Sequence, residues 1–419
     1  MKGSKRVMDK LAAKGGTPVR SVPFPPWPQF DDAERSAVLR VLDSRNWWAT
    51  EGTEVRAFEA EWSAFTGASG TAALTNGTAA LEVALAALDV GQGDEVIIPA
   101  WSFMATIGAV LAANAIPVIV DVDLHTGTID VAAAAAAITG RTRAIIPVHL
   151  GGGVADLDGL RKLATEHGLV ILEDAAQAHG STWHGQHAGT VGDAGTFSFQ
   201  ASKNMTAGEG GAVVSRRPEI VERVTSLVNC GRHPGCWYYR HFELAGNLRL
   251  SEWQGAVMRV QLQRFPAQQE IRSANVDFLT ATLADISGVV PLGRHKGCTS
   301  QGNYDYMVNF DPDLFPDRDR LRTALLAEGM PLTTAYPPMH QLEMFSREGG
   351  LAPHIRDTSA YPAYASLHMP VTEHLSKTAI WFKTEVLTGS RQDAQSVVDA
   401  IEKVHGRAAE IAELEPTEW

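Results

Sequence analysis

Short apolar runs alternate with helical patterns from Thr71 to about Ser215. Six runs, mostly rich in β-branched residues, are predicted as strands: Glu95–Ala100, Pro117–Val122, Ala144–His149, Leu169–Glu173, Thr196–Gln200 and Ala212–Ser215. Ala- and Leu-rich stretches with helical spacing separate them. This alternation predicts an α/β fold with a large, mostly parallel sheet and helices on both faces. Ligands bind such sheets beyond the carboxyl ends of the strands, so functional residues are expected just after these runs.

The segments on either side of this region differ in pattern. Residues 1–30 predict an arm, because the prolines of FPPWPQF forbid regular structure there. The segment from Asp31 predicts a capped amphipathic helix, and a second helix is expected over Thr53–Phe65. We assign residues 31–275 to one large domain. Residues 276–419 predict a smaller α+β domain that ends in a helix over Arg391–Val404.

Composition narrows the class of protein. The chain has 419 residues, 45% of them hydrophobic and 20% charged, with a net charge of -12. This acidity argues against nucleic acid or an anionic membrane as the main partner. Apolar runs are far shorter than the roughly 20 residues that span a bilayer, and MKGSKRVMDKLAAKGG lacks the apolar stretch of a signal peptide. A cytoplasmic protein is expected.

The cysteines carry little chemistry. There are three of them, Cys230, Cys236 and Cys298. An odd number in a chain of this size predicts reduced thiols rather than a disulfide framework. Their spacing, with no paired His/Cys set, predicts no metal site.

Two turns in the predicted sheet could hold parts of a ligand. TNGTAAL (Thr75–Leu81) leads into an Ala/Leu helix, whose free N–H groups suit a phosphate, although a plain strand–helix turn has the same pattern. IIPAWSFMAT (Ile97–Thr106) places Trp101 and Phe103 after a strand. Either ring could stack on a flat cofactor, but large aromatic residues are more often simply buried.

Two further segments place charged groups beside apolar strands. ILEDAAQAHG runs from a buried strand into Glu173 and Asp174. A carboxylate there is costly without a cation or metal, and a protonated pyridine nitrogen is one such partner; a helix N-cap aspartate is the other interpretation. TFSFQASKNMTAGEGGAVV places Lys203 in a small polar loop between strands. Such a lysine is either solvated, the usual case, or an imine-forming amine.

The order of these motifs, together with GNLRLSEWQGA (Gly246–Ala256), resembles the DegT/DnrJ/EryC1/StrS aminotransferase family. The resemblance covers nearly the whole chain, and EDAAQAHG with FSFQxxKxxxxGEGGAVV is its most specific part. It implies the fold type I of enzymes dependent on pyridoxal 5'-phosphate (PLP), with a seven-stranded sheet. It also implies an aminotransferase in which an amino acid, glutamine or glutamate, donates the amino group.

The resemblance further implies roles for eight residues. Lys203 matches the lysine that forms the Schiff base with PLP and then moves protons. Asp174 matches the partner of the pyridine nitrogen, Gln177 that of the ring's 3-oxygen, and Phe103, rather than Trp101, the stacking aromatic. Three residues fall on phosphate-binding positions: Gly77, Thr78 and Ser198. Asn247 matches an asparagine that a neighbouring subunit contributes to the phosphate, which implies a homodimer with shared active sites.

The acceptor is less defined than the cofactor. FPPWPQFDDAER, Trp47–Trp48, FSFQ and NCGR resemble the branch that includes aminohydroxybenzoate (AHBA) synthase and scyllo-inosose aminotransferases, and Gln200 stands where nucleotide-sugar members more often have His. The chain departs from the cyclitol enzymes at WFKTEVL, where a His pair is expected. A keto-cyclitol or ketosugar of aminoglycoside-like secondary metabolism is the favoured acceptor.

Two alternatives stay open from the sequence. One is an AHBA-synthase-like enzyme that dehydrates and aromatises its substrate. The other is a regulatory protein that binds PLP without catalysis. Six residues are left without a role, because packing or solvation explains each equally well: Trp47, Trp48, His179, Tyr336, His340 and Lys383.

Overall fold

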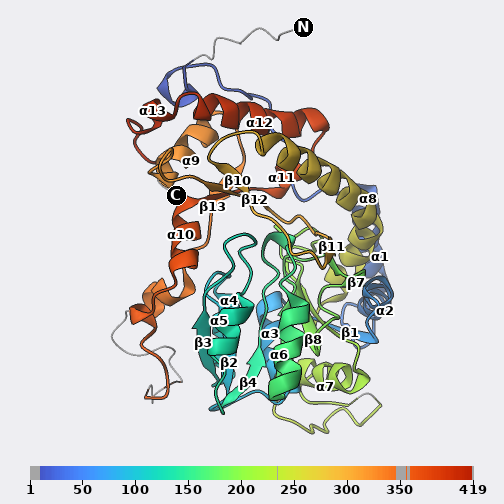
Figure 1. The fold of residues 1–419 in the computed structure, drawn as a ribbon. Coiled ribbons are helices and arrows are strands. Elements are labelled where there is room, and N and C mark those ends of the chain that lie inside the picture. Colours follow the sequence, from blue (N-terminus) through green and yellow to red (C-terminus); the bar gives the residue numbers. More distant parts are fainter. Residues whose placement is uncertain (1–9, 234, 346–354, 356–358, 418–419) are drawn as a thin grey trace.

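The computed structural model describes residues 10–233, 235–345, 355 and 359–417, and it divides into a large lower and a small upper part (Figure 1). The strands are β1 (Gly70–Leu74), β2 (Glu95–Pro99), β3 (Ile116–Val120), β4 (Thr142–Ile145), β5 (Val170–Asp174), β6 (Thr182–Trp183), β7 (Gln186–His187), β8 (Ala194–Ser198), β9 (Gly211–Ser215), β10 (Val289–Pro291), β11 (Cys298–Ser300), β12 (Tyr306–Phe310), β13 (Leu332–Thr334) and β14 (Ala379–Phe382). The α-helices are α1 (Asp32–Ser44), α2 (Glu54–Thr66), α3 (Gly77–Ala87), α4 (Ala105–Ala112), α5 (Val131–Ala136), α6 (Leu157–His167), α7 (Pro218–Val228), α8 (Glu252–Leu283), α9 (Arg318–Ala327), α10 (Pro370–Thr378), α11 (Thr384–Leu387), α12 (Arg391–His405) and α13 (Ala408–Ile411). Short 3-10 turns cover Ala12–Lys14, Leu150–Gly152, Met339–Gln341, Glu343–Phe345 and Tyr364–Ser366.

The large sheet has the predicted seven strands, in the order β1-β9-β8-β5-β4-β2-β3. The pairs from β8 to β3 are parallel, and only β9 runs antiparallel to its neighbours. Alternate residues of one strand reach opposite faces: Ile98 packs in the core with α3, α4 and α7, whereas Ile97 packs with α5 and α6. The sheet is therefore covered on both faces, as the apolar runs predict.

The small part is built on an antiparallel sheet, β10-β12-β14-β13, which shares one hydrophobic core with α9 and α12. The amino-terminal arm joins its core, because Leu11 is fully buried there. Glu328 fixes the arm by accepting hydrogen bonds from Ala12 N and Val19 N, both at 2.9 Å, and by pairing with Lys403. The arm is thus part of this core rather than a free extension.

Helix α8 connects the two parts. It packs on α1 and α2 in the large part and on α11 and α12 in the small one, along the right side of Figure 1. The boundary predicted between residues 275 and 276 falls inside this helix, because its helical pattern continues without a break to Leu283.

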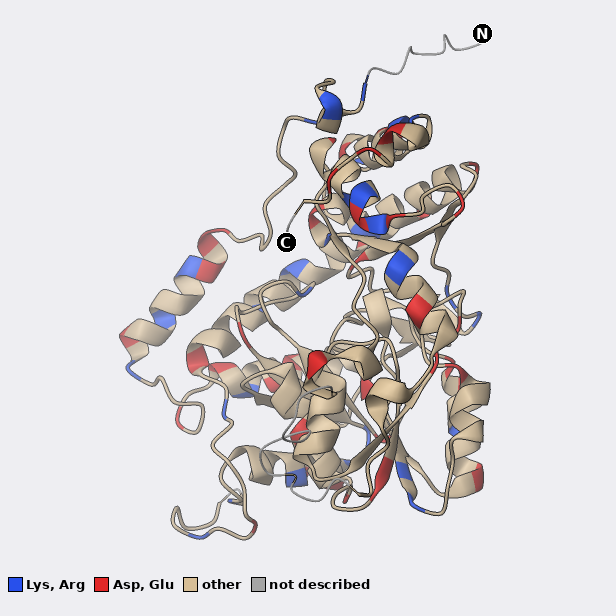
Figure 2. Ribbon diagram, turned by 90° about the vertical axis from the view of Figure 1, so that its left-hand side faces the viewer, with Lys and Arg blue, Asp and Glu red and all other residues tan. Residues whose placement is uncertain are grey.

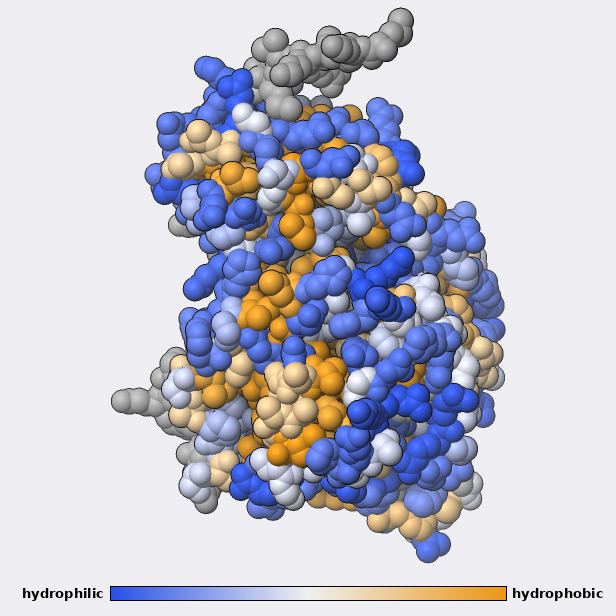
Figure 3. Space-filling view, in the orientation of Figure 1, coloured by the Kyte–Doolittle hydropathy of each residue, from blue (hydrophilic) through white to orange (hydrophobic). Residues whose placement is uncertain are grey.

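The surface exposes both charged and hydrophobic residues. Basic and acidic residues are interspersed along the helices in the side view (Figure 2). In the front view, hydrophobic residues gather in the middle, over the helices that cover the large sheet (Figure 3). Within the described residues, no helix has the length and hydropathy needed to cross a membrane.

Candidate active site

A cavity of about 790 Å³ lies where β5 and β8 end and α3 begins. The residues expected to hold PLP line it together: Gly77, Thr78, Phe103, Asp174, Gln177, Ser198 and Lys203. Most of them follow a strand directly or begin a helix, which is the position that ligands take in parallel sheets. Asn247, the eighth predicted residue, does not line the cavity.

Two adjacent carboxylates end β5 but have different partners. Glu173 is fully buried and accepts hydrogen bonds from the amides of Gly189, Val191 and Gly192. It also bonds at 2.8 Å to Nε2 of His149, whose Nδ1 accepts from Ala155 N, so Nε2 is the donor. These bonds satisfy the Glu173 carboxylate, and its role is structural.

Asp174 is 6% exposed and has fewer partners. Thr106 Oγ1 donates to Oδ2 at 2.9 Å and Ala176 N donates to Oδ1 at 3.2 Å. No ion pair of Asp174 occurs among the described residues. Burial raises the pKa of this carboxyl group, although both hydrogen bonds and the charge of Lys203 oppose the rise. A cation placed against Asp174 would remove this cost.

Lys203 lines the same cavity from the loop after β8. Its Nζ sits 4.4 Å from the ring centroid of Tyr304. Burial lowers the pKa of Lys203, whereas the charges of Asp305 and Asp174 raise it. The loop therefore presents an amine that loses its proton more easily than an exposed lysine does.

The amino end of α3 forms a third side of the cavity. Asn76 caps the helix by accepting a hydrogen bond from Ala79 N at 2.8 Å. Because the first amides of a helix have no intrahelical acceptor, those of Gly77 and Thr78 are free for an anion. A Cβ atom at Gly77 would lie 2.8 Å from Cβ of Ser198, so only glycine keeps this corner open.

Phe103 and Gln177 flank the cavity. The Phe103 side chain is 53% exposed, and its ring centroid lies 5.9 Å from that of Tyr336. Trp101, by contrast, is fully buried and donates to the Tyr336 carbonyl at 3.0 Å, so Phe103 is the aromatic residue that faces the cavity. Gln177 accepts from Gly151 N at 2.7 Å and donates to the Tyr336 hydroxyl at 3.3 Å.

Asn247 is exposed, in the segment between α7 and α8. It forms an isolated bridge with Asn229. The same segment carries exposed apolar side chains: Trp237 (72%), Tyr239 (68%) and Leu244 (102%). Large exposed apolar groups of this kind are typical of protein–protein contacts.

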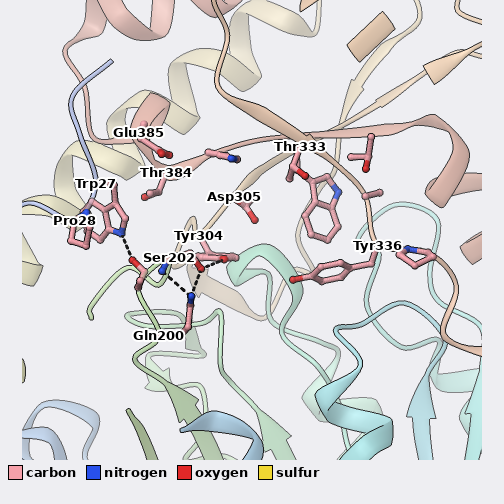
Figure 4. Close-up of a pocket in the computed structure, with 16 residues that line it drawn as sticks. Trp27, Pro28, Gln200, Ser202, Tyr304, Asp305, Thr333, Tyr336, Thr384 and Glu385 are labelled. Atoms are coloured by element: carbon pink, nitrogen blue, oxygen red, sulfur yellow. Dashed lines mark hydrogen bonds between the residues drawn. The ribbon is translucent and has the colours of Figure 1, made fainter. Parts of the chain in front are cut away.

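A second pocket of about 550 Å³ lies beside the cavity and shares Gln200, Ser202, Tyr304 and Tyr336 with it. It lies between the arm, the large part and the small part. Figure 4 shows Trp27 and Pro28 at one side, with Asp305 and Tyr336 directed toward the middle. Trp27 is held there by a bond from its Nε1 to the carbonyl of Ala201 at 3.1 Å. Lys383, which the sequence left without a role, lines this pocket.

Tyr336, also left without a role, lines both pockets, whereas the other four unassigned residues line neither. His179 is fully buried among the rings of Trp62, Phe197 and Phe199, and burial lowers its pKa to about 3. His340 is buried and bonds to Glu373 at 3.2 Å. Trp47 and Trp48 do not line either pocket; they contact Trp253, Tyr238 and Arg249.

Sequence reasoning missed Thr106, Tyr304 and Asp305. Thr106 bonds to Asp174 across 68 residues of chain, which no local pattern reveals. Tyr304 and Asp305 precede β12, and the only signal is an aspartate between tyrosines in YDY. Long-range placement brings all three to the site.

The family model of the DegT/DnrJ/EryC1/StrS aminotransferase family matches residues 28–386. The chain belongs to this family. A Streptomyces kanamyceticus protein, provisionally named L-glutamine:3-amino-2,3-dideoxy-scyllo-inosose aminotransferase, is 40% identical over 96% of this chain and 98% of its own. The L-glutamine:2-deoxy-scyllo-inosose aminotransferase of Streptoalloteichus tenebrarius is 38% identical over 94% and 97%. The crystal structure of AHBA synthase is 35% identical, with a TM-score of 0.84 over 94% of this chain and 100% of its own.

As a member of this family, the chain is a PLP-dependent aminotransferase of fold type I. Its residues fit that cofactor on three counts. Asp174 is a buried carboxylate that forms no ion pair with any described residue, α3 offers free amides to a phosphate, and Gly77 leaves a space that a side chain would fill. The amine of Lys203 lies on the same cavity.

Proposed function

We propose that this aminotransferase moves the amino group of L-glutamine to the ketone of a keto-cyclitol. The observation that carries the proposal is that Asp174, a buried carboxylate with no ion pair among the described residues, and the partly buried amine of Lys203 line one cavity. Both named cyclitol relatives use L-glutamine, and each matches nearly the full chain.

Each wall of the cavity has a role toward PLP in this proposal. Asp174 would pair with the pyridine nitrogen, Gln177 would bond to the ring's 3-oxygen and Phe103 would cover the ring. Gly77 and Thr78 at the amino end of α3, together with Ser198 of β8, would hold the phosphate. PLP supplies an aldehyde that binds amines covalently and an electron sink for the adjacent carbon.

Lys203 both binds the cofactor and moves protons. A lysine attacks an aldehyde only as the neutral amine, and burial favours that form by lowering the pKa. Because the amine of Lys203 lines the cavity that would hold the reacting carbon, its Nζ could take a proton from one atom of the substrate and return it to another. The carboxylates of Asp174 and Asp305 limit how far the pKa falls.

The second pocket suits the acceptor. It combines the aromatic faces of Trp381 and Tyr336 with the hydroxyl groups of Thr333 and Thr384. Rings cover the apolar C–H faces of a cyclitol, and hydroxyls bond to its oxygens. The pocket shares Tyr304 and Tyr336 with the cofactor cavity, so a ketone bound there lies close to Lys203.

A homodimer completes the proposed site. Asn247 is exposed and outside its own cavity, and exposed aromatic side chains precede it in the same segment. We assign Asn247 to the phosphate in the partner subunit's cavity. The exposed rings of this segment then become buried in the dimer.

Spectroscopy of the half-reaction tests the function. With PLP bound, glutamine should remove the visible absorbance band, and the keto-cyclitol should restore it. Lys203→Ala should have neither the band nor turnover, whereas Lys162→Ala, an exposed lysine of α6, should retain both. An AHBA-synthase-like enzyme would instead form a product that absorbs in the near ultraviolet without an amino donor. A Lys203→Ala protein that keeps the band and turnover would contradict the proposal.

A further inference from the structure

The loop that carries Lys203 is fixed on both sides of the lysine by one distant segment of the chain. Ser202, directly before the lysine, bonds through its hydroxyl to that of Tyr304 at 2.7 Å. Asn204, directly after it, is fully buried and donates from Nδ2 to the carbonyl of Gly302 at 2.6 Å. The place of the lysine therefore depends on the segment that leads into β12.

The hydrogen bonds around Ser202 run in one direction. The side-chain oxygen of Gln200 can only accept, and it receives the Ser202 hydroxyl at 2.7 Å and the Ser202 amide at 2.8 Å. Because the Ser202 hydrogen goes to Gln200, the Tyr304 hydroxyl is the donor in the bond between Tyr304 and Ser202. Figure 4 shows these three side chains joined beside the second pocket. Burial raises the pKa of Tyr304, so its hydroxyl keeps the donated hydrogen at neutral pH.

Tyr304 also contacts the lysine side chain directly. The tyrosine is buried, and its backbone N–H donates to the Gly151 carbonyl at 3.0 Å, which fixes the ring from behind. Nζ of Lys203 lies 4.4 Å from the ring centroid. This is the distance of a cation–π contact, which favours the protonated amine. Tyr304 thus reaches the lysine twice, through its ring and through the residue before the lysine.

We propose that Tyr304 is a positioning residue for Lys203: its ring holds the amine, and its hydroxyl fixes the loop that carries the lysine. This inference rests on the role proposed for Lys203 and adds a residue that acts through it. Tyr304 lines both the cofactor cavity and the second pocket, so it holds the amine at the side that the two share. When the amine takes a proton, the ring stabilises the ammonium there, and the proton stays beside the reacting atoms.

Competitive acetylation of the PLP-free protein measures the effect of the ring. Acetic anhydride reacts with neutral amines, so the labelling of each lysine against pH, read by mass spectrometry, gives its pKa. Tyr304→Leu keeps the surroundings apolar but has no ring, and it should lower the pKa of Lys203 by about one unit. Tyr304→Phe retains a ring and should retain most of that pKa. Lys162, an exposed lysine of α6, is the internal reference in every sample.

Other titratable groups face the Lys203 amine but are the same in all these variants. Burial lowers the pKa of the amine, and the charges of Asp305 and Asp174 raise it. His179 stays neutral, since burial lowers its own pKa to about 3. A fall that occurs only in Tyr304→Leu therefore measures the ring. A pKa of Lys203 that is unchanged or higher in Tyr304→Leu, or that falls equally in Tyr304→Phe, would overturn the inference.

The rate of PLP attachment measures the effect of the hydroxyl. Above the pKa of Lys203, the visible band should form about two- to tenfold more slowly in Tyr304→Phe, because the loop loses one hydrogen bond. Ser202→Ala should slow it at least as much, and adding Tyr304→Phe to Ser202→Ala should slow it no further, because both variants remove the same bond. Tyr306→Phe is the matched control, since this buried tyrosine bonds to Thr280 instead and should attach PLP at the wild-type rate.

The outcomes separate this inference from the function beneath it. Labelling and attachment need neither glutamine nor a ketone, so a cofactor spectrum that glutamine leaves unchanged would contradict the proposed function alone. Tyr304→Phe removes a single oxygen, so the rate measurement stands even where Tyr304→Leu lowers stability. Equal slowing in Tyr304→Phe and Tyr306→Phe, or additive effects of the Tyr304 and Ser202 changes, would show that the hydroxyl does not act through the lysine loop, and the proposal would fail.

Discussion

Glu173 and Asp174 are neighbours at the end of β5, yet substitution should affect them in opposite ways. Asp174→Asn removes the charge that stabilises a protonated pyridine, so PLP affinity and the rate of the glutamine half-reaction should each fall at least about tenfold. The PLP-free protein should be no less stable, because burial raises the pKa of Asp174 and its ionised form costs folding energy.

Glu173→Gln is the matched control for this prediction. It removes the charge that accepts three amide hydrogens and the His149 proton, so the melting temperature of the PLP-free protein should fall. Thermal unfolding and PLP titration of both variants measure the two effects. A loss of stability in Asp174→Asn that matches the loss in Glu173→Gln would show that Asp174 is also structural.

At the scale of single elements, the start of α3 depends on Gly77, a residue with no side chain. Gly77→Ala would place a Cβ atom 2.8 Å from Cβ of Ser198, inside normal contact distance, and push the helix start away from the phosphate. PLP affinity should fall about tenfold, as measured by equilibrium titration of absorbance. Gly140→Ala, which has open space around the new methyl, should leave affinity unchanged. Equal affinity in both variants would show that the helix end adapts.

Helix α2 holds a carboxylate that costs stability at high pH. Glu59 accepts from Ala73 N of β1 at 2.9 Å, and burial raises its pKa to about 7. Because the pKa of Glu59 is higher in the folded state than its unfolded value near 4.5, folding is favoured while the group is protonated. The free-energy cost of ionising Glu59 in the folded state grows from about pH 4.5 to about pH 7 and is complete above pH 7. Glu59→Gln retains an acceptor for Ala73 and should add about 1–2 kcal/mol to the unfolding free energy at pH 8.

The same substitution should have little effect at pH 4.5, where Glu59 is protonated in the folded state and only half ionised in the unfolded state. Chemical denaturation at the two pH values checks this sign. Glu61→Gln on the same helix is a control, because Glu61 pairs with Arg259 and its removal should not stabilise the protein. A gain that is equal at both pH values would rule out ionisation as the cause.

Strands of the large sheet were predictable because they are buried on both faces and read as continuous apolar runs. The run Ala144–His149 nevertheless ends its ladder at Ile145, since Pro147 has no N–H to donate. Strand β1 was not predicted, because GTAAL has little β-propensity and gains its place by pairing with β9. The arm's own sequence also does not predict that it is buried, because its position depends on hydrogen bonds to Glu328, more than 300 residues away.

Over the whole molecule, the residues proposed to hold the cofactor could be grouped from the sequence, because strand ends bring seven of them to one cavity and because their motifs are specific to the family. The residues of the proposed acceptor pocket could not, since Trp27, Asp305 and Glu385 come from the arm and the small part. Only the packing of the two parts across α8 creates this pocket. In the proposed function, the choice of acceptor therefore depends on the least local part of the fold.

A homodimer with shared sites predicts recovery of activity by mixing two inactive proteins. Lys203→Ala removes the amine from a subunit's own cavity. Asn247→Asp places a negative charge near the phosphate bound by the partner subunit and should weaken PLP binding strongly. In a mixed dimer, the Asn247→Asp subunit keeps its own Lys203 and receives Asn247 of the partner subunit, so one of its two sites is intact. The other site carries both defects.

Unfolding and refolding the two variants together should therefore restore about a quarter of wild-type activity, because half of the dimers are mixed and each has one working site. Each variant refolded alone is the control. Both should stay inactive when the PLP concentration is below the dissociation constant of the Asn247→Asp protein for PLP. Asn247 acting within its own subunit would give a different result: Lys203 and Asn247 would then serve the same cavity, every Asn247→Asp subunit would lack a working site, and mixing would restore nothing. The recovered fraction thus measures which subunit Asn247 serves, independently of the acceptor that the enzyme uses.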